Sequence, residues 1–199
     1  LLTLLGAGHE TTTASLTWTL RWILGTPGVR ERATEEVRSV LGSGVLDFSK
    51  MAQLPYLDAC VQEALRLGPP IPIVPRRLAA PAVLGGDSLP AGTFVAPSPY
   101  LSQRDPEVFP DPLRFDPARF LGRRPGPFEF FPFGGGTSIC IGLPFAVFET
   151  KVVLATLLRQ ADLRLAAPVE CRGARRGIVV VPGDGTPVVV ERRVIPAGA

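Results

Sequence analysis

The segment that most limits which fold this chain can adopt is residues 133–142, because it joins a glycine-rich loop, one cysteine and the start of a helix. The three consecutive glycines of this loop lack a Cβ, so the backbone can approach a flat ligand closely. Cys140 comes just before Pro144, which begins a strongly apolar helix expected to end near Gln160. Amide groups and the dipole of a helix N-terminus favour a charged sulfur. We therefore expect Cys140 to be a thiolate, with a small buried core residue as the alternative interpretation.

Three helices are expected upstream, at residues 1–25, 27–41 and 55–67. Gly6 and Gly8 interrupt the first, and each costs about 1 kcal/mol relative to Ala, so another interaction must compensate for them. The first helix is apolar on several faces and should expose apolar surface if it lacks neighbours. The second should bury Val29, Ala33, Val37 and Val40 and expose the charged Arg32 and Glu36. The third ends at Gly68-Pro69-Pro70 because proline stops a helix.

The rest of the chain reads as short strands and coil. Residues 98–136 show neither the helical nor the strand period of apolar residues, which predicts a long functional coil held in place by aromatic side chains. Strands are expected at residues 71–78, 82–84 and 93–96, and a closing hairpin pairs residues 178–181 with 188–192 around Gly183-Asp184-Gly185.

Charge and cysteine content exclude several classes of protein. The net charge of +3 comes from 21 basic and 18 acidic residues without a long basic run, which is unlike a nucleic-acid-binding surface. Cys60, Cys140 and Cys171 are odd in number and far apart, which argues against a disulfide scaffold or a zinc site and favours a reducing compartment. No apolar run in the sequence is long enough to span a bilayer.

Glu63 is placed unusually for a carboxylate. At 100° per residue it falls among Tyr56, Cys60 and Leu67 on the apolar side of its helix. A carboxylate buried without a partner is costly, so Glu63 should need cations. The alternative is an ordinary exposed pair of Glu63 with Arg66.

The spacing Phe-x-x-Gly-x-x-x-Cys-x-Gly, filled by Phe133, Gly136, Cys140 and Gly142, resembles the heme-binding signature of the cytochrome P-450 family. The resemblance implies that Cys140 ligates the iron of heme b (iron protoporphyrin IX). It implies the mainly α fold with small β-sheets (α+β) of the C-terminal portion of that family. Residues 1–199 are then expected to be the heme-binding part of one domain whose N-terminal half is absent.

Two further segments resemble the same family. Glu63-Ala64-Leu65-Arg66 resembles its Glu-x-x-Arg motif, and residues 117–120 resemble its Pro-x-Arg-Phe segment. In the family the glutamate pairs with both arginines, so Glu63, Arg66 and Arg119 are expected to form a structural triad that holds the Cys140 loop. Planar guanidinium groups suit such bidentate pairing.

Ala7-Gly8-His9-Glu10-Thr11-Thr12 is similar to the family's oxygen-activating helix segment. The resemblance implies that Ala7 and Gly8 leave room above the heme and that Glu10 and Thr11 relay protons. The Thr11 hydroxyl is expected to bond the carbonyl of Ala7 and open a groove in the helix. A helix N-terminal pattern is the alternative. His9 is assigned a surface or packing role.

A heme propionate needs a cation, and the resemblance assigns this role to Arg76 in preference to Arg77. The choice depends on the number of residues between the arginine and Leu89-Pro90-Ala91-Gly92, which resembles the family's Ile-Pro-x-Gly turn. The sequence departs from the family at Ser138, where an Arg or His is usual two residues before the cysteine. This departure removes one cation from a propionate and should weaken heme affinity.

The resemblance implies a monooxygenase that inserts one oxygen atom from dioxygen into a small apolar organic substrate, with a ferredoxin or flavoprotein reductase as electron donor. The axial thiolate favours cleavage of the O–O bond. Two alternatives stay open: a truncated, non-catalytic remnant that binds heme weakly or not at all, and a peroxide-using relative, against which Glu10 and Thr11 argue. No nucleic-acid partner and a cytoplasmic location are expected, with a membrane anchor in preceding sequence left open.

Overall fold

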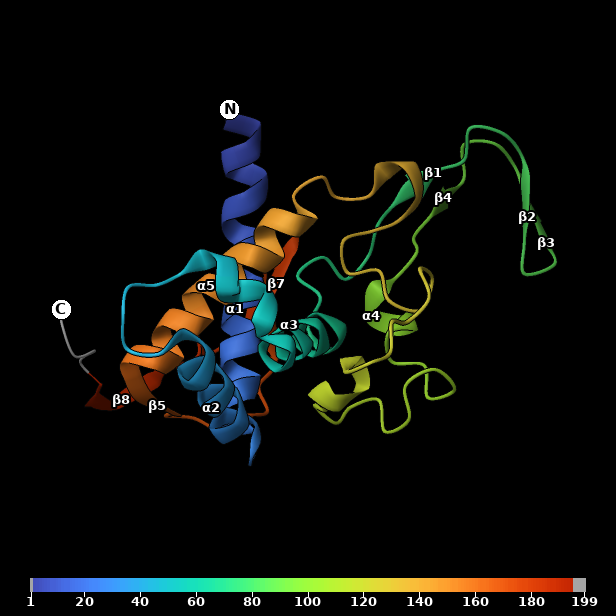
Figure 1. Cartoon of the computed structure of the whole chain (residues 1–199). Helices are drawn as coiled ribbons and strands as arrows, with labels where there is room; N and C mark the ends of the chain where they lie inside the picture. The colour runs from blue at the N-terminus through green and yellow to red at the C-terminus, as the bar shows by residue number, and fades with distance from the viewer. Residues whose placement is uncertain (1, 195–199) are drawn as a thin grey trace.

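The computed structural model describes residues 2–194 and is mainly helical, with small antiparallel sheets of two strands each, so the expected fold class is confirmed (Figure 1). Its helices are α1 Leu2–Gly25, α2 Val29–Leu41, α3 Pro55–Leu67, α4 Pro99–Ser102 and α5 Leu143–Gln160, with short 3-10 helices η1 Phe48–Gln53, η2 Pro117–Phe120 and η3 Gly136–Ser138. Its strands are β1 Arg76–Arg77, β2 Ala82–Leu84, β3 Asp87–Leu89, β4 Phe94–Val95, β5 Ala161–Leu165, β6 Gly173–Arg176, β7 Val179–Pro182 and β8 Val188–Arg193. Residue 1 of the expected first helix and residues 195–199 of the expected domain lie outside the described residues.

The core lies where α1, α2, α3 and α5 pack together. Ile23, Val37, Leu57 and Leu154, one from each helix, are fully buried, and burial of each such side chain contributes about 1.5–3 kcal/mol. The N-terminal part of α1 projects beyond this core, as Figure 1 shows. Its apolar residues Leu2, Leu4 and Leu5 are exposed, which confirms the expected apolar surface. Within residues 2–194 none of the helices has the length and apolar character needed to cross a bilayer.

The contact between α2 and α3 corrects one expectation. Val29, Ala33 and Val37 are buried as predicted, but Glu36 is half-buried, and its carboxylate accepts hydrogen bonds from the backbone N–H groups of Tyr56 and Leu57 at 2.8 Å. The residue before α3 is Leu54, whose side chain cannot cap a helix, so the first N–H groups of α3 need an acceptor from elsewhere. Glu36 supplies it, and its negative charge also suits a helix N-terminus.

The expected closing hairpin is wrong. Strand β7 pairs with β6, and β8 pairs with β5. The turn at residues 183–185 forms, but Asp184 accepts hydrogen bonds from the Arg21 side chain at 2.7 Å and from the Thr186 amide at 3.0 Å. The turn is thereby held against α1 and connects two sheets.

The first expected strand is shorter than predicted. Only β1 remains of residues 71–78, because Pro72 and Pro75 have no N–H to donate to a sheet. The longest coil lies between α4 and α5, as expected, and η2 and η3 are its only helical turns within the described residues.

Candidate functional site

Cys140 lies at the end of the glycine-rich loop, directly before α5, and its side chain is exposed. Its backbone N–H donates to the carbonyl of Phe133 at 3.0 Å, and its own carbonyl accepts from Leu143 at 3.3 Å. Gly134 and Gly136 have φ of 73° and 67°, which side-chain-bearing residues rarely adopt, so this path of the loop favours glycine. The exposure of the thiol rules out the alternative of a buried core cysteine.

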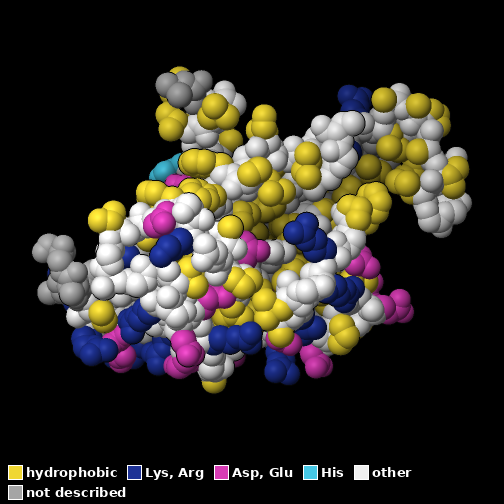
Figure 2. Space-filling model, in the orientation of Figure 1, with side chains coloured by type: hydrophobic (Ala, Val, Ile, Leu, Met, Phe, Trp, Pro, Cys, Tyr) yellow, Lys and Arg dark blue, Asp and Glu magenta, His cyan; other side chains and the backbone are white. Residues whose placement is uncertain are grey.

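The surface around Cys140 is apolar. Its neighbour Ile141 is 90% exposed and Phe145, one turn into α5, is 68% exposed. Figure 2 shows hydrophobic side chains gathered in a hollow between the projecting end of α1 and the arm that carries β2 and β3. Large exposed apolar areas of this kind mark a binding surface.

A groove of about 370 Å³ separates the N-terminal parts of α1 and α5 and includes Gly8 and Phe145 in its walls. A Cβ built on Gly6 or Gly8 would meet no atom within 4 Å, so packing among the described residues does not require either glycine. Packing among residues 2–194 therefore does not compensate for their cost, which is about 1 kcal/mol each. The exposed thiol and its apolar surround fit a flat, largely apolar macrocycle such as heme, whereas the groove at Gly8 also has polar side chains such as Thr12 and Glu149 in its walls.

The predicted hydrogen bond of Thr11 is present, with its hydroxyl donating to the carbonyl of Ala7 at 2.6 Å. Four other hydroxyls of α1 make the same bond to the fourth residue before them, namely those of Thr13, Ser15, Thr17 and Thr19. The helix nevertheless runs unbroken from Leu2 to Gly25, so the expected groove within the helix does not form. Glu10, directly before Thr11, is exposed.

The structure brings Glu63, Arg66 and Arg119 together. The buried Glu63 carboxylate accepts two hydrogen bonds from Arg66, at 2.7 and 2.8 Å, and Nε of Arg119 lies 3.4 Å from its Oε1. The backbone N–H of Asp116, beside η2, donates to the same oxygen at 2.9 Å. Glu63 and Arg66 are both fully buried, so the alternative of an exposed pair is wrong.

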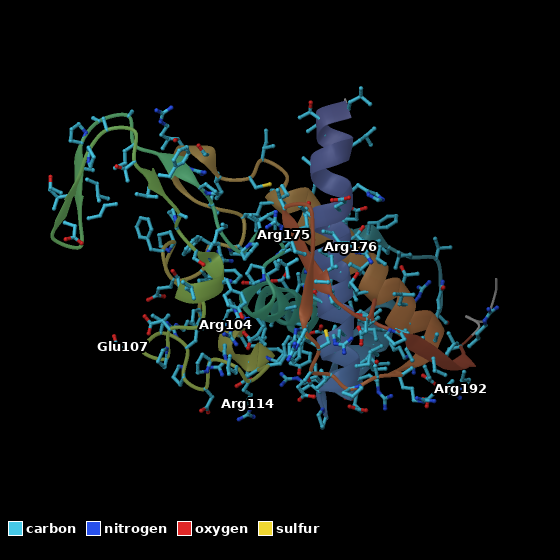
Figure 3. The ribbon with its side chains drawn as sticks, turned by 180° about the vertical axis from the view of Figure 1, so that it is seen from behind. Arg104, Glu107, Arg114, Arg175, Arg176 and Arg192 are labelled. Atoms are coloured by element: carbon cyan, nitrogen blue, oxygen red, sulfur yellow. The ribbon has the colours of Figure 1, made fainter. Side chains whose placement is uncertain are left out.

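Arg66 also binds the coil between α4 and α5. Its guanidinium donates to the carbonyls of Gln103 at 2.8 Å, Pro112 at 2.7 Å and Arg114 at 3.2 Å. Figure 3 shows Arg104 between α3 and α4 and Arg114 further along this coil. One buried cation thus holds three separate points of the chain that precedes Cys140.

Comparison with known proteins shows the family of this chain. The family model for cytochrome P-450 matches residues 1–180. The chain belongs to the cytochrome P-450 family. It is 38% identical over 191 residues to the taurochenodeoxycholic 6 alpha-hydroxylase of Sus scrofa, covering 92% of this chain and 37% of the relative. It is 39% identical over 194 residues to the putative cytochrome P-450 138 of Mycobacterium tuberculosis, and the match covers 97% of this chain and 41% of the relative. It is 42% identical over 156 residues to the human cytochrome P-450 4A11, and that match covers 76% of this chain and 30% of the relative. The chain therefore spans roughly a third to two fifths of the length of these relatives.

Arg76, the residue predicted to bind a propionate, and its neighbour Arg77 form strand β1 of this cytochrome P-450 chain. Arg76 and Arg77 pair with Val95 and Phe94, so their side chains point to opposite faces of the β1–β4 sheet. The guanidinium of Arg77 lies over the Phe94 ring, 6.0 Å from its centroid, whereas Arg76 donates to the carbonyl of Pro75 at 3.0 Å and is exposed. Both guanidinium groups are exposed, so this geometry does not distinguish Arg76 from Arg77, and the assignment of Arg76 stays a prediction. Ser138, in η3, is exposed and brings no charge.

The sequence interpretation missed Gln103, a fully buried glutamine that lies between α3 and the Cys140 loop. A signal for it exists in the sequence. Pro69 and Pro70 have no N–H groups, so the carbonyls of Leu65 and Arg66, four residues earlier, lack helical partners. A donor from another segment had to be present, although its position could not be read from the pattern.

Proposed function

We propose that residues 1–199 are the heme-binding, C-terminal part of a monooxygenase that inserts one oxygen atom from dioxygen into a small apolar organic substrate. The observation that carries this proposal is the exposed Cys140 thiol, held at a helix start within an apolar surround. A ferredoxin or a flavoprotein reductase would supply the electrons. The name of the Sus scrofa relative describes a hydroxylase, and hydroxylation is a reaction of this class.

Each site residue has a proposed task. The Cys140 sulfur would ligate the iron of a bound heme. The Phe133 carbonyl holds the Cys140 backbone, and Gly142, which has no Cβ, leaves space beside the sulfur. Gly136 permits the loop's turn, and Ala7 and Gly8 keep the facing helix surface small. Arg76 would neutralise a propionate. A bound heme with Cys140 as its thiolate ligand would supply the activation of dioxygen.

The residues proposed to deliver protons, Glu10 and Thr11, lie on α1. Glu10 is exposed and ionisable, and the Thr11 hydroxyl, bonded to the carbonyl of Ala7, can accept a proton from one side while donating to the other. A carboxyl and a hydroxyl at adjacent positions suit a proton relay from solvent toward the heme site.

Heme titration tests the proposal directly. The purified chain is titrated with heme, reduced and exposed to carbon monoxide. The expected result is the red-shifted Soret band of a thiolate-ligated heme, because Cys140 is accessible without unfolding. Binding without that band, or no binding, would contradict the proposal for this chain.

Thr11→Ala should uncouple oxygen use from product formation in the heme-loaded, full-length enzyme supplied with its electron donor. General acid–base groups contribute about 10²–10⁴-fold to a rate, so product formed per oxygen consumed should fall several-fold. The matched control is Thr13→Ala, which removes an equivalent bond to the carbonyl of His9 at 2.7 Å. Equal coupling in both variants would remove the proton-relay role of Thr11.

A heme-binding protein without turnover is the second candidate. The exposed Leu2, Leu4 and Leu5 favour it, because a site open on this side admits water. The two candidates separate when the heme-loaded chain is supplied with an electron donor and substrate. Thiolate ligation without product supports the second candidate.

A further inference from the structure

Two carbonyl groups in the last turn of α3 have no hydrogen-bond donor within the helix. Four residues after Leu65 and Arg66 stand Pro69 and Pro70, which have no N–H, so the two carbonyls receive no helical hydrogen bond. Both Leu65 and Arg66 are buried, so water does not supply the missing donors at low cost.

Gln103 provides the donors. Its Nε2 lies 3.0 Å from the carbonyl oxygen of Leu65 and 3.1 Å from that of Arg66, and the whole side chain is buried. The side-chain amide has two N–H groups, one for each carbonyl. These two acceptors also determine the orientation of the amide, because a flipped amide would set oxygen against oxygen.

The other end of the same amide binds the Cys140 loop. Oε1 of Gln103 accepts the backbone N–H of Phe131 at 3.1 Å. The carbonyl of Phe131 in turn accepts the N–H of Gly134 at 2.9 Å, and the carbonyl of Phe133 accepts the N–H of Cys140 at 3.0 Å. A continuous series of hydrogen bonds thus connects the end of α3, through one side chain, to the loop that ends at Cys140.

We propose that Gln103 is a positioning residue for this loop, which sets the place of Cys140 relative to α3. The task requires a side chain that donates twice and accepts once, and a primary amide does both. The Glu63 triad holds the coil before the loop, whereas Gln103 holds the base of the loop itself. That this positioning serves iron ligation rests on the proposed function; the hydrogen-bonded connection does not.

Gln103→Met tests the connection in the full chain without heme, because methionine keeps the length of the side chain and removes all three hydrogen bonds. Loss of a buried hydrogen bond leaves its partner unsatisfied, so amide exchange across residues 131–140 should accelerate about tenfold or more. Amides of α2 should change much less. Gln53→Met, at an exposed position, is the control and should leave both segments unchanged. Uniform acceleration in both segments, or none in the loop, overturns the proposal.

Gln103→Glu keeps the inference testable if the methionine variant unfolds. A carboxyl group that faces two carbonyl oxygens favours its protonated form, so it keeps an acceptor for the Phe131 amide and has one O–H in place of the two N–H donors for Leu65 and Arg66. The Phe131 amide should therefore stay protected while the end of α3 exchanges faster. Loss of protection at Phe131 together with α3 contradicts the acceptor role of Gln103.

The heme-loaded chain gives a second, spectroscopic measurement. With carbon monoxide and reductant, Gln103→Met should shift a several-fold larger share of the heme from the thiolate Soret band to a band without thiolate ligation, and Gln53→Met should not. An unchanged share would overturn the link to ligation. If the unsubstituted chain shows no thiolate band, the proposed function fails, and amide exchange alone decides whether Gln103 positions the loop.

Discussion

Cys140→Ala should abolish the red-shifted Soret band of the reduced, carbon monoxide-bound chain completely. The sulfur is the only part of the residue that is lost, since both hydrogen bonds of Cys140 use its backbone. Because the side chain is exposed, the free energy of unfolding should change by no more than about 0.5 kcal/mol. The spectrum and a denaturant titration of the same preparation measure the two effects.

The other cysteines provide the control for this experiment. Cys60 is fully buried, and burial raises its pKa, so its thiol stays protonated and cannot replace Cys140 as a thiolate ligand. Cys171 is half-buried after β5, and Cys171→Ala should leave the band unchanged. A thiolate band that survives Cys140→Ala and disappears with Cys171→Ala would move the ligand to that position.

Glu63→Gln should destabilise the chain by about 3–5 kcal/mol, because it leaves the buried Arg66 guanidinium without its counter-ion. The glutamine is nearly the same size, so the effect reports the charge and not a cavity. The free energy of unfolding from a denaturant titration is the measurement. This loss is a large fraction of the stability of an ordinary domain, so heme retention should fall with it.

Glu191→Gln is the matched control. Glu191 pairs with Arg164 at 3.2 Å, but both side chains are about half exposed, and pairs of this kind contribute about 0–1 kcal/mol. Equal destabilisation by Glu63→Gln and Glu191→Gln would show that the buried ion pair of Glu63 contributes no more to the free energy of unfolding than an exposed pair. The structural role assigned to the triad would then be wrong.

Local sequence predicted the helices well. The bounds of α3 were predicted to the residue, because Pro55 begins the helix and Gly68-Pro69-Pro70 ends it. The burial of Glu63 followed from its place on the apolar side of that helix. Both features depend on residues within one or two turns of each other, which a sequence pattern displays directly.

Strand pairing was predicted poorly. A turn signal at residues 183–185 suggested that its flanking strands pair, and the turn does form. Strand β7 pairs instead with β6, the strand just before it, across a turn at Gly177, which has φ of 58°, and β8 pairs with β5. The glycine-rich turn at residues 183–185 was thus preferred over Gly177, the single glycine that makes the hairpin.

Local sequence patterns were enough to show that a cysteine stands at a glycine-rich loop before a helix, and that a glutamate on an apolar helix face needs cations. The family resemblance named Arg119 as a partner of Glu63, and the structure places them 3.4 Å apart. Only the packed structure shows which distant groups bind the unpaired backbone groups of α3, namely Glu36 at its start and Gln103 at its end. The physical reason is that an unsatisfied donor, acceptor or charge can be recognised locally. Its partner is chosen by how the helices pack, and that depends on the whole chain.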